Sequence, residues 1–168
     1  MTSNRLSLAG AAISLAVLYF NLRPWWRGGR NLKDLVPFAQ SALLGAFSTV
    51  CAGGLLGWLA GCSVQSANTA GYKAVPGTTG TQDTGLSRGT FDRLTPEGGV
   101  VVFLLTMVVA AAWKAAGKQD RRRMAGGAFV GATLCMTAGV AGMLGGLPSA
   151  ANHLGDGLKA ALEGQGVL

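Results

Sequence analysis

The chain has 168 residues, a formal net charge of +7 and a mean hydropathy of +0.38; 49% of its residues are hydrophobic and only 12% are charged. The charged fraction is about half of the roughly 25% typical of soluble domains, so the composition argues against a soluble protein, with an apolar-cored helical hairpin as the soluble alternative. Three cysteines give no disulfide framework. A single histidine, His153, excludes a histidine-based zinc or catalytic cluster within one chain.

Four apolar stretches follow one another along the chain. A span needs about 20 apolar residues to cross a hydrocarbon core of about 30 Å. The second and fourth stretches meet this length, whereas the first and third lie near its lower limit. We therefore expect an all-α integral membrane protein with four transmembrane helices over Leu6–Leu22, Ser41–Cys62, Gly99–Ala116 and Ala125–Leu147.

These spans divide the chain into four parts. An N-terminal two-span hairpin with a basic connector covers residues 1–62, and a polar extracytoplasmic loop rich in glycine and threonine covers 63–98. A second two-span hairpin with a basic turn covers 99–147, and an amphipathic tail covers 148–168. The predicted location is the cytoplasmic membrane, crossed several times.

The charges are partitioned between the segments that join the spans. Against only Asp34 and Asp120, the first and third connectors hold nine cations, which account for the whole net charge: Arg23, Arg27, Arg30, Lys33, Lys114, Lys118, Arg121, Arg122 and Arg123. The remaining segments are neutral in sum. Because Lys and Arg in short loops stay on the cytoplasmic side, the sequence predicts that both termini lie outside.

The first span resembles a signal peptide, but no small-residue cleavage site follows it, which favours a signal anchor. Trp25 and Trp26 beside Arg23 and Arg27 are typical of a membrane interface, and Trp113 is expected to mark the exit of the third span. Asn31 is a candidate cap for a short interfacial helix.

The second span ends in Leu59-Ala60-Gly61-Cys62, which resembles a bacterial lipobox. Lipidation of Cys62 is one interpretation. The alternative is chance, because a span rich in leucine, alanine and glycine that ends in cysteine often produces this tetrapeptide.

Two spans carry small residues at every fourth position, which places them on one helix face. In lipid such glycine-zipper faces allow close approach of helices. The faces can pack within one subunit or between subunits, and both alternatives remain open. The second span contributes Gly45, Thr49, Gly53, Gly57 and Gly61, and the fourth contributes Gly127, Gly131, Cys135 and Gly139 with Ala138, Gly142 and Gly146 beside them.

The third span is bulky rather than glycine-rich, which suits a lipid-facing helix, and Thr95 is a plausible cap before Pro96 and Glu97. The 63–98 segment lacks a hydrophobic period and is expected to be a flexible linker or an interaction surface. In the tail, leucines four residues apart predict a weak amphipathic helix on the outer surface, weakened by Gly155 and Gly157; the leucines are Leu154, Leu158 and Leu162.

No group of residues supports an enzyme, a cofactor or a metal site, and the absence of a buried ionisable residue within the spans counts against a pump. The basic connectors are the strong polar feature. They hold the loops inside and contact anionic lipid, or they contact the phosphates of nucleic acid. In a ring of subunits, Arg121, Arg122 and Arg123 would form a positive collar, and a DNA translocase is a possible partner.

The layout of the whole chain resembles small membrane proteins of actinobacterial mobile elements, including the Spd plasmid-spread proteins of mycelial conjugation. Residues 99–147, with two apolar helices around the basic turn Lys118–Arg123, are similar to the hairpin of VirB/TrbC-type conjugative pilins. These resemblances imply a non-enzymatic, self-associating channel or scaffold component of a conjugative or secretion apparatus. The alternatives are a phage holin that permeabilises the membrane, a pilin-like filament subunit, and a scaffold without a pore.

Overall fold

The computed structural model describes residues 5–51 and 53–164. This part of the chain is all-helical and contains no strand. Besides a 3-10 turn at Leu32–Asp34, its helices are α1 (Leu8–Arg27), α2 (Val36–Val50), α3 (Gly54–Thr79), α4 (Pro96–Ala115), α5 (Lys118–Leu134), α6 (Ala138–Met143) and α7 (Leu147–Leu162). The prediction of an all-α protein is confirmed.

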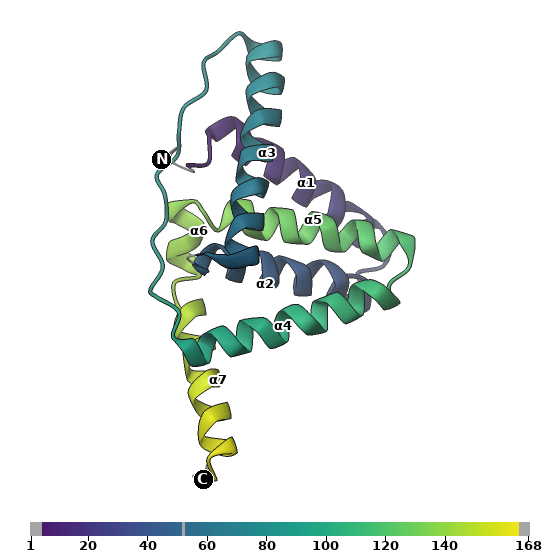
Figure 1. Cartoon of the computed structure of the whole chain (residues 1–168). Coiled ribbons are helices and arrows are strands. Elements are labelled where there is room, and N and C mark those ends of the chain that lie inside the picture. Colours follow the sequence, from purple (N-terminus) through teal and green to yellow (C-terminus); the bar gives the residue numbers. More distant parts are fainter. Residues whose placement is uncertain (1–4, 52, 165–168) are drawn as a thin grey trace.

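Four of these helices form a layer, in the order α1, α5, α2, α4 (Figure 1). Helices α1 and α4 end on the same side of the molecule, and α2 and α5 begin there. At the opposite end of the layer, α3 and α7 cross the direction of the four helices and extend away from each other (Figure 1). Helix α3 packs on α1, and α7 packs on α4. Helices α1 and α4 correspond to the first and third apolar stretches, whereas α2 and α5 contain only the beginnings of the second and fourth.

The centre of the layer is the contact between α2 and α5, which is made through small residues. A side chain placed on Gly45 of α2 would meet the backbone of Ala128, and one placed on Gly131 of α5 would meet the backbone of Ala42. Gly127 likewise faces Phe38 and Ser41. Close approach of the two backbones therefore requires glycine here, and Gly45, Gly127 and Gly131 pack within the chain.

The second apolar stretch is not one helix, so the prediction of a continuous span over Ser41–Cys62 is wrong. Helices α2 and α3 meet at an angle of 102°, and Gly53 precedes α3 in an extended conformation. The bend divides the predicted glycine face, because Gly45 and Thr49 lie on α2 whereas Gly57 and Gly61 lie on α3. The bend is stabilised because α3 buries Val64, Ala67 and Gly71 and packs on α1.

The fourth apolar stretch is also interrupted, so the predicted span over Ala125–Leu147 is wrong in its second half. Helix α5 ends at Leu134 and the short helix α6 follows. The backbone between them does not continue the helix but forms hydrogen bonds with the loop before α4. Gly89 donates its N–H to the carbonyl of Met136 at 3.0 Å, and Ala138 donates its N–H to the carbonyl of Ser87 at 3.0 Å.

The polar segment 63–98 is a loop only in part, since its first half is helical. Helix α3 continues to Thr79, and its carboxyl end is closed by Gly80 with a φ of 69°. The extended remainder runs back along the beginning of α1, where Leu8 donates its N–H to Thr84 at 2.8 Å and Leu86 donates to Leu6 at 2.9 Å. This return places the start of α4 beside α7.

The third apolar stretch is a single helix, α4, as predicted. Thr95 caps it by accepting a hydrogen bond from the N–H of Gly98 at 3.0 Å. Asn31 similarly caps the 3-10 turn by accepting from Lys33 at 3.2 Å. Among the described helices, α4 is the one that is clearly long and apolar enough to cross a membrane, and the bent pair α2–α3 passes the same test only when its members are counted together.

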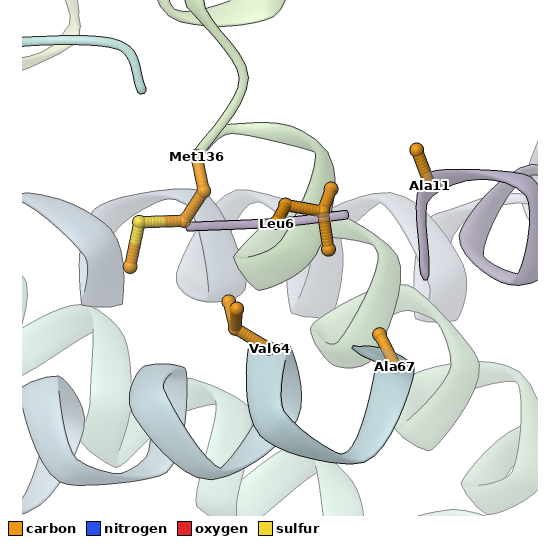
Figure 2. Close-up of a cluster of buried hydrophobic side chains, with 5 residues drawn as sticks. All are labelled: Leu6, Ala11, Val64, Ala67 and Met136. Carbon is orange, nitrogen blue, oxygen red and sulfur yellow. The ribbon is translucent and has the colours of Figure 1, made fainter. Parts of the chain in front are cut away.

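Two apolar clusters hold the crossing helices on the layer. In the first, Leu6 lies among Val64 and Ala67 of α3 and Met136 from the turn after α5, with Ala11 of α1 beside it (Figure 2). The second cluster joins Phe47 of α2, Val102 of α4 and Ala151 of α7. Each cluster therefore ties one crossing helix to both halves of the chain.

Candidate functional site at the basic end

The nine connector cations gather at one end of the four-helix layer, where α1 and α4 end and α2 and α5 begin. We call this region the basic end and define it by these residues: Arg23, Arg27, Arg30, Lys33, Lys114, Lys118, Arg121, Arg122 and Arg123. Two segments about 90 positions apart in the sequence are thus brought together, and the partition of charge seen in the sequence becomes a partition in space.

Two of the arginines connect backbone segments at this end. The Arg121 guanidinium donates to the carbonyls of Trp113 and Lys114, each at 3.0 Å, and so binds the free carbonyls at the end of α4. Arg123 donates to the carbonyl of Asp34 at 3.0 Å and forms an ion pair with Asp120 at 3.7 Å. These two side chains fix the turn between α4 and α5 and attach it to the first connector.

Lys118 and Arg122 line two hollows beside these fixed arginines. One hollow, of about 600 Å³, lies between the end of α4 and the start of α5 and is also lined by Trp113. The other, of about 550 Å³, lies between α1 and α5 and is lined by Phe20 and Asn21 as well. A hollow lined by both cationic and apolar side chains suits a phosphate group attached to an apolar body.

The first connector reverses the chain directly after α1. Arg30 has a φ of 59°, in the left-handed region, and donates its N–H to Trp25 at 3.2 Å. Of the three predicted interfacial tryptophans, Trp26 and Trp113 are exposed. The indole N–H of Trp25 is instead buried with no acceptor among the described residues, so Trp25 packs against the protein.

The opposite end of the layer carries balanced charge. It has a cavity of about 490 Å³ between the end of α2, the start of α3 and the loop 88–93, and Arg88, Asp92 and Arg93 lie in its lining.

At the start of α1, burial tends to raise the pKa of the Asp83 carboxyl, but hydrogen bonds from the Ala9 N–H, the Ser7 side chain and the Thr84 N–H outweigh this and lower the pKa. Asp83 accepts from Ala9 at 3.0 Å and stabilises the start of α1.

The remaining predicted site residues are dispersed. Of the glycines not used between α2 and α5, several have open space around them: Gly53, Gly139, Gly142 and Gly146. Cys62 is half-buried within α3, and its lipidation stays a prediction. In the described part of the chain, no three metal-ligating side chains come together.

Sequence reasoning missed two asparagines that organise the end opposite the basic end. Asn68 of α3 accepts a hydrogen bond from the Ser7 N–H at 2.8 Å and donates to the Arg5 carbonyl at 2.8 Å. Asn152 of α7 accepts from the Thr95 N–H at 2.9 Å and donates to the Arg93 carbonyl at 3.3 Å. The available signal was a polar amide followed three residues later by glycine in both segments.

Comparison of the chain with protein-family models, with curated proteins and with solved structures finds no match.

Proposed function

We propose that this protein crosses the cytoplasmic membrane four times, through α1, α2, α4 and α5, with the basic end inside and both termini outside. In this proposal it is a non-enzymatic, self-associating channel or scaffold component of an apparatus that transfers DNA or protein. The observation that carries the proposal is the gathering of the whole net charge at one end of a helical layer whose outer helix exposes large apolar side chains.

Helix α4 supplies the apolar half of this observation. Its exposed side chains are Val100, Phe103, Leu104, Met107 and Val108, with Phe103 61% exposed. In water, an apolar surface this continuous would be a liability for a monomer. In a bilayer the same side chains contact hydrocarbon without a free-energy penalty, which supports the proposal that this face of α4 contacts lipid.

The two central helices are shorter than a bilayer core. At 1.5 Å per residue, α2 with 15 residues and α5 with 17 residues reach about 22 and about 26 Å. In α5 the charged first turns lie at the basic end, so its uncharged part, residues 124–134, covers about 16 Å. A bilayer can thin locally around short spans. Non-helical backbone is tolerated at membrane depth where protein covers it, and the turn after α5 meets this condition because Cys135 and Met136 are buried.

Helix α7 fits the outer membrane surface. Leu158 and Leu162 of α7, together with Val100 of α4, line a hollow of about 310 Å³ in the angle between the two helices. Leu158 and Leu162 therefore lie on the side of α7 that faces α4. If α4 spans the membrane, the acyl chains lie on that side. Such a helix in the interface plane buries its apolar face in the headgroup region.

The basic end supports contact with phosphate. Lys118 and Arg122 line hollows there, and both lipid headgroups and nucleic acid present the matching group. The close contact of α2 with α5 fills the centre of the layer, so a channel would have to form between several copies. This requirement links the channel interpretation to self-association, with a DNA translocase as the proposed partner at the cytoplasmic side.

Cysteine labelling in intact cells tests this proposal. In a background in which Cys51, Cys62 and Cys135 are replaced by serine, single cysteines replace Lys33, Lys118, Thr69 or His153. We expect an impermeant maleimide to label positions 69 and 153 in intact cells, and positions 33 and 118 only after permeabilisation. Equal labelling of all four positions in intact cells, or recovery of the protein in the soluble fraction, would contradict four spans.

The oligomeric state then tests the functional part. Native mass spectrometry of the detergent-purified protein should show a defined oligomer, and a strictly monomeric protein would rule out both channel and filament. Co-expression with a muralytic enzyme separates the alternative function. Timed release of that enzyme with loss of viability would support a holin instead of a transfer component.

A further inference from the structure

The two asparagines occupy the same position in two similar arrangements. Each accepts a hydrogen bond from the N–H of the residue that caps the first helix of its own half, Ser7 for α1 and Thr95 for α4. Each donates to the carbonyl two residues before that cap, in Arg5 and Arg93. The same two hydrogen bonds, with the same donors and acceptors, thus occur in both halves of the chain. This repetition indicates that the two halves have the same local structure.

The sequence before the two layer helices agrees with this. Residues 5–10 read Arg-Leu-Ser-Leu-Ala-Gly, and residues 93–98 read Arg-Leu-Thr-Pro-Glu-Gly. The two segments lie 88 positions apart, and at the same spacing Trp25 corresponds to Trp113. Helices α1 and α4 that follow have 20 residues each and begin at corresponding positions.

The crossing helices also correspond. Residues 67–71 read Ala-Asn-Thr-Ala-Gly and residues 151–155 read Ala-Asn-His-Leu-Gly, 84 positions apart. Both alanines are buried. Gly71 lies against the backbone of Ala9 and Gly10, and Gly155 lies against the backbone of Glu97 and Gly98. Because residues 9 and 10 correspond to residues 97 and 98, the two glycines make the same close approach to corresponding places.

The central contact is symmetric when the halves are exchanged. Ala42, Gly45 and Ala46 of α2 correspond to Ala128, Gly131 and Ala132 of α5, 86 positions apart. Gly45 faces Ala128 and Gly131 faces Ala42, so each contact has its counterpart with the partners exchanged. Reciprocal contacts of this kind define a twofold, isologous interface.

The two apolar clusters are counterparts as well. The first contains Leu6 and Ala67; the second contains the corresponding Ala151, and the corresponding Leu94 is partly buried and packs against it. Each cluster is completed from the other half of the chain, the first by Met136 and the second by Phe47. Each half therefore contributes to the other's cluster as well as to its own.

We infer that the chain is a tandem duplication, in which residues 5–79 and 93–162 are two copies of one helical unit related by a pseudo-twofold axis between α2 and α5. The α2–α5 surface is the self-association surface of this unit, and its partner is the second copy. In the second unit, α6 and α7 together correspond to α3 of the first. This inference rests on geometry and sequence and is independent of the proposed function.

The pseudo-twofold axis fixes how the two units are oriented relative to each other. A twofold axis parallel to the layer helices places both units the same way round, as in transporters built from parallel repeats. Helix α1 then shares the environment of α4, and both basic connectors lie on one side. It also means that the glycines of the α2–α5 surface are occupied within the chain, so further copies of the protein must join through other surfaces.

Distances between spin labels test the symmetry in the full-length protein. Nitroxides are attached to cysteines introduced in pairs at exposed corresponding positions: Tyr19 and Met107 in α1 and α4, and Thr69 and His153 in α3 and α7. The native cysteines are replaced by serine. Pulsed electron resonance should give the same distance for 19–69 as for 107–153, and the same distance for 19–153 as for 107–69.

The second equality is the decisive one. Two helical hairpins of similar shape can give equal distances within each hairpin, but equal distances between the hairpins require a twofold axis that relates them. Unequal distances for 19–153 and 107–69 would overturn the duplication even if the protein is fully membrane-bound. If labels at 19 or 107 disturb folding, the exposed pair Leu15 and Phe103 replaces them at the same spacing. Measurement in detergent makes the result independent of the four-span proposal, which the maleimide labelling tests separately.

Discussion

Helices α2 and α4 belong to the same layer but present opposite surfaces. Helix α2 meets α5 through Gly45 and small neighbours at backbone contact, whereas α4 turns Phe103, Met107 and Val108 away from the rest of the protein. In a water-soluble bundle, large apolar residues fill the inside. Here small residues lie at the central helix contact and large ones outside, which is the arrangement expected where lipid replaces water and helices associate by close packing.

The largest expected effect comes from blocking the small-residue contact. Gly131→Leu places a side chain against the backbone of Ala42, and because backbone cannot move aside, we expect a loss of at least about 3 kcal/mol, at the upper end of overpacking effects. Thermal unfolding in detergent measures it. Gly139→Leu is the matched control, since Gly139 has open space around it; an equal loss in both variants would contradict the contact.

A charge on the outer face of α4 tests whether this surface meets lipid. Phe103→Lys places an ammonium group near the middle of the helix, which costs about 3 kcal/mol in a bilayer and almost nothing in water. We expect reduced membrane insertion, measured by the glycosylation or protease protection of a reporter. Val36→Lys is the control, because Val36 is also more than half exposed but lies at the basic end. Unchanged insertion of Phe103→Lys would indicate that α4 does not face hydrocarbon.

Removal of either asparagine side chain that holds the start of a layer helix, which we call an asparagine clamp, should have a smaller effect of similar size in the two halves. Asn68→Ala and Asn152→Ala each leave a backbone N–H and a backbone carbonyl without their partner, at a cost of about 1–3 kcal/mol. We expect similar reductions in melting temperature for both variants. His153→Ala, at the exposed residue next to Asn152, should leave the melting temperature unchanged. A loss confined to one of the two asparagine variants would argue against equivalent halves.

The smallest expected effect is on phosphate binding, and it distinguishes Arg122, which we propose contacts phosphate, from Arg121, which stabilises the turn between α4 and α5. Arg122→Ala should weaken binding of a fluorescent single-stranded oligonucleotide or an anionic lipid by about 1 kcal/mol, or about fivefold, with no change in melting temperature. Arg121→Ala should lower the melting temperature because the carbonyls of Trp113 and Lys114 lose their donor. Titration in neutral-lipid nanodiscs at low salt reads the first effect. Unchanged affinity for both ligands in Arg122→Ala would remove Arg122 from the phosphate site.

Local signals in the sequence were sufficient for two helix starts and for the distribution of charge. Thr95 and Asn31 cap as predicted because capping depends on residues within one turn. The basic end follows from counting charges between apolar stretches. The bends after Val50 and Leu134 were not predictable, since apolar composition continues through both and the bend is imposed by packing against α1 and the loop 87–89.

The helical half of the 63–98 segment and the duplication were missed for a related reason. Val64, Ala67 and Gly71 follow helical spacing, but glycine and threonine around them conceal it. The repeat is carried by short matches separated by loops of unequal length, so the spacing changes from 88 to 86 to 84 positions. The matches join into one pattern in the folded chain, through the equivalent hydrogen bonds of Asn68 and Asn152 and the equivalent glycine contacts.

The asparagine clamps also set an order of events during synthesis. Ser7 and Asn68 are 61 residues apart, and Thr95 and Asn152 are 57 apart. When α1 leaves the ribosome, its capping segment must wait for most of the first unit before Asn68 can hold it. The starts of α1 and α4 are therefore fixed in two steps, the first when α3 has been made and the second only when α7 has been made.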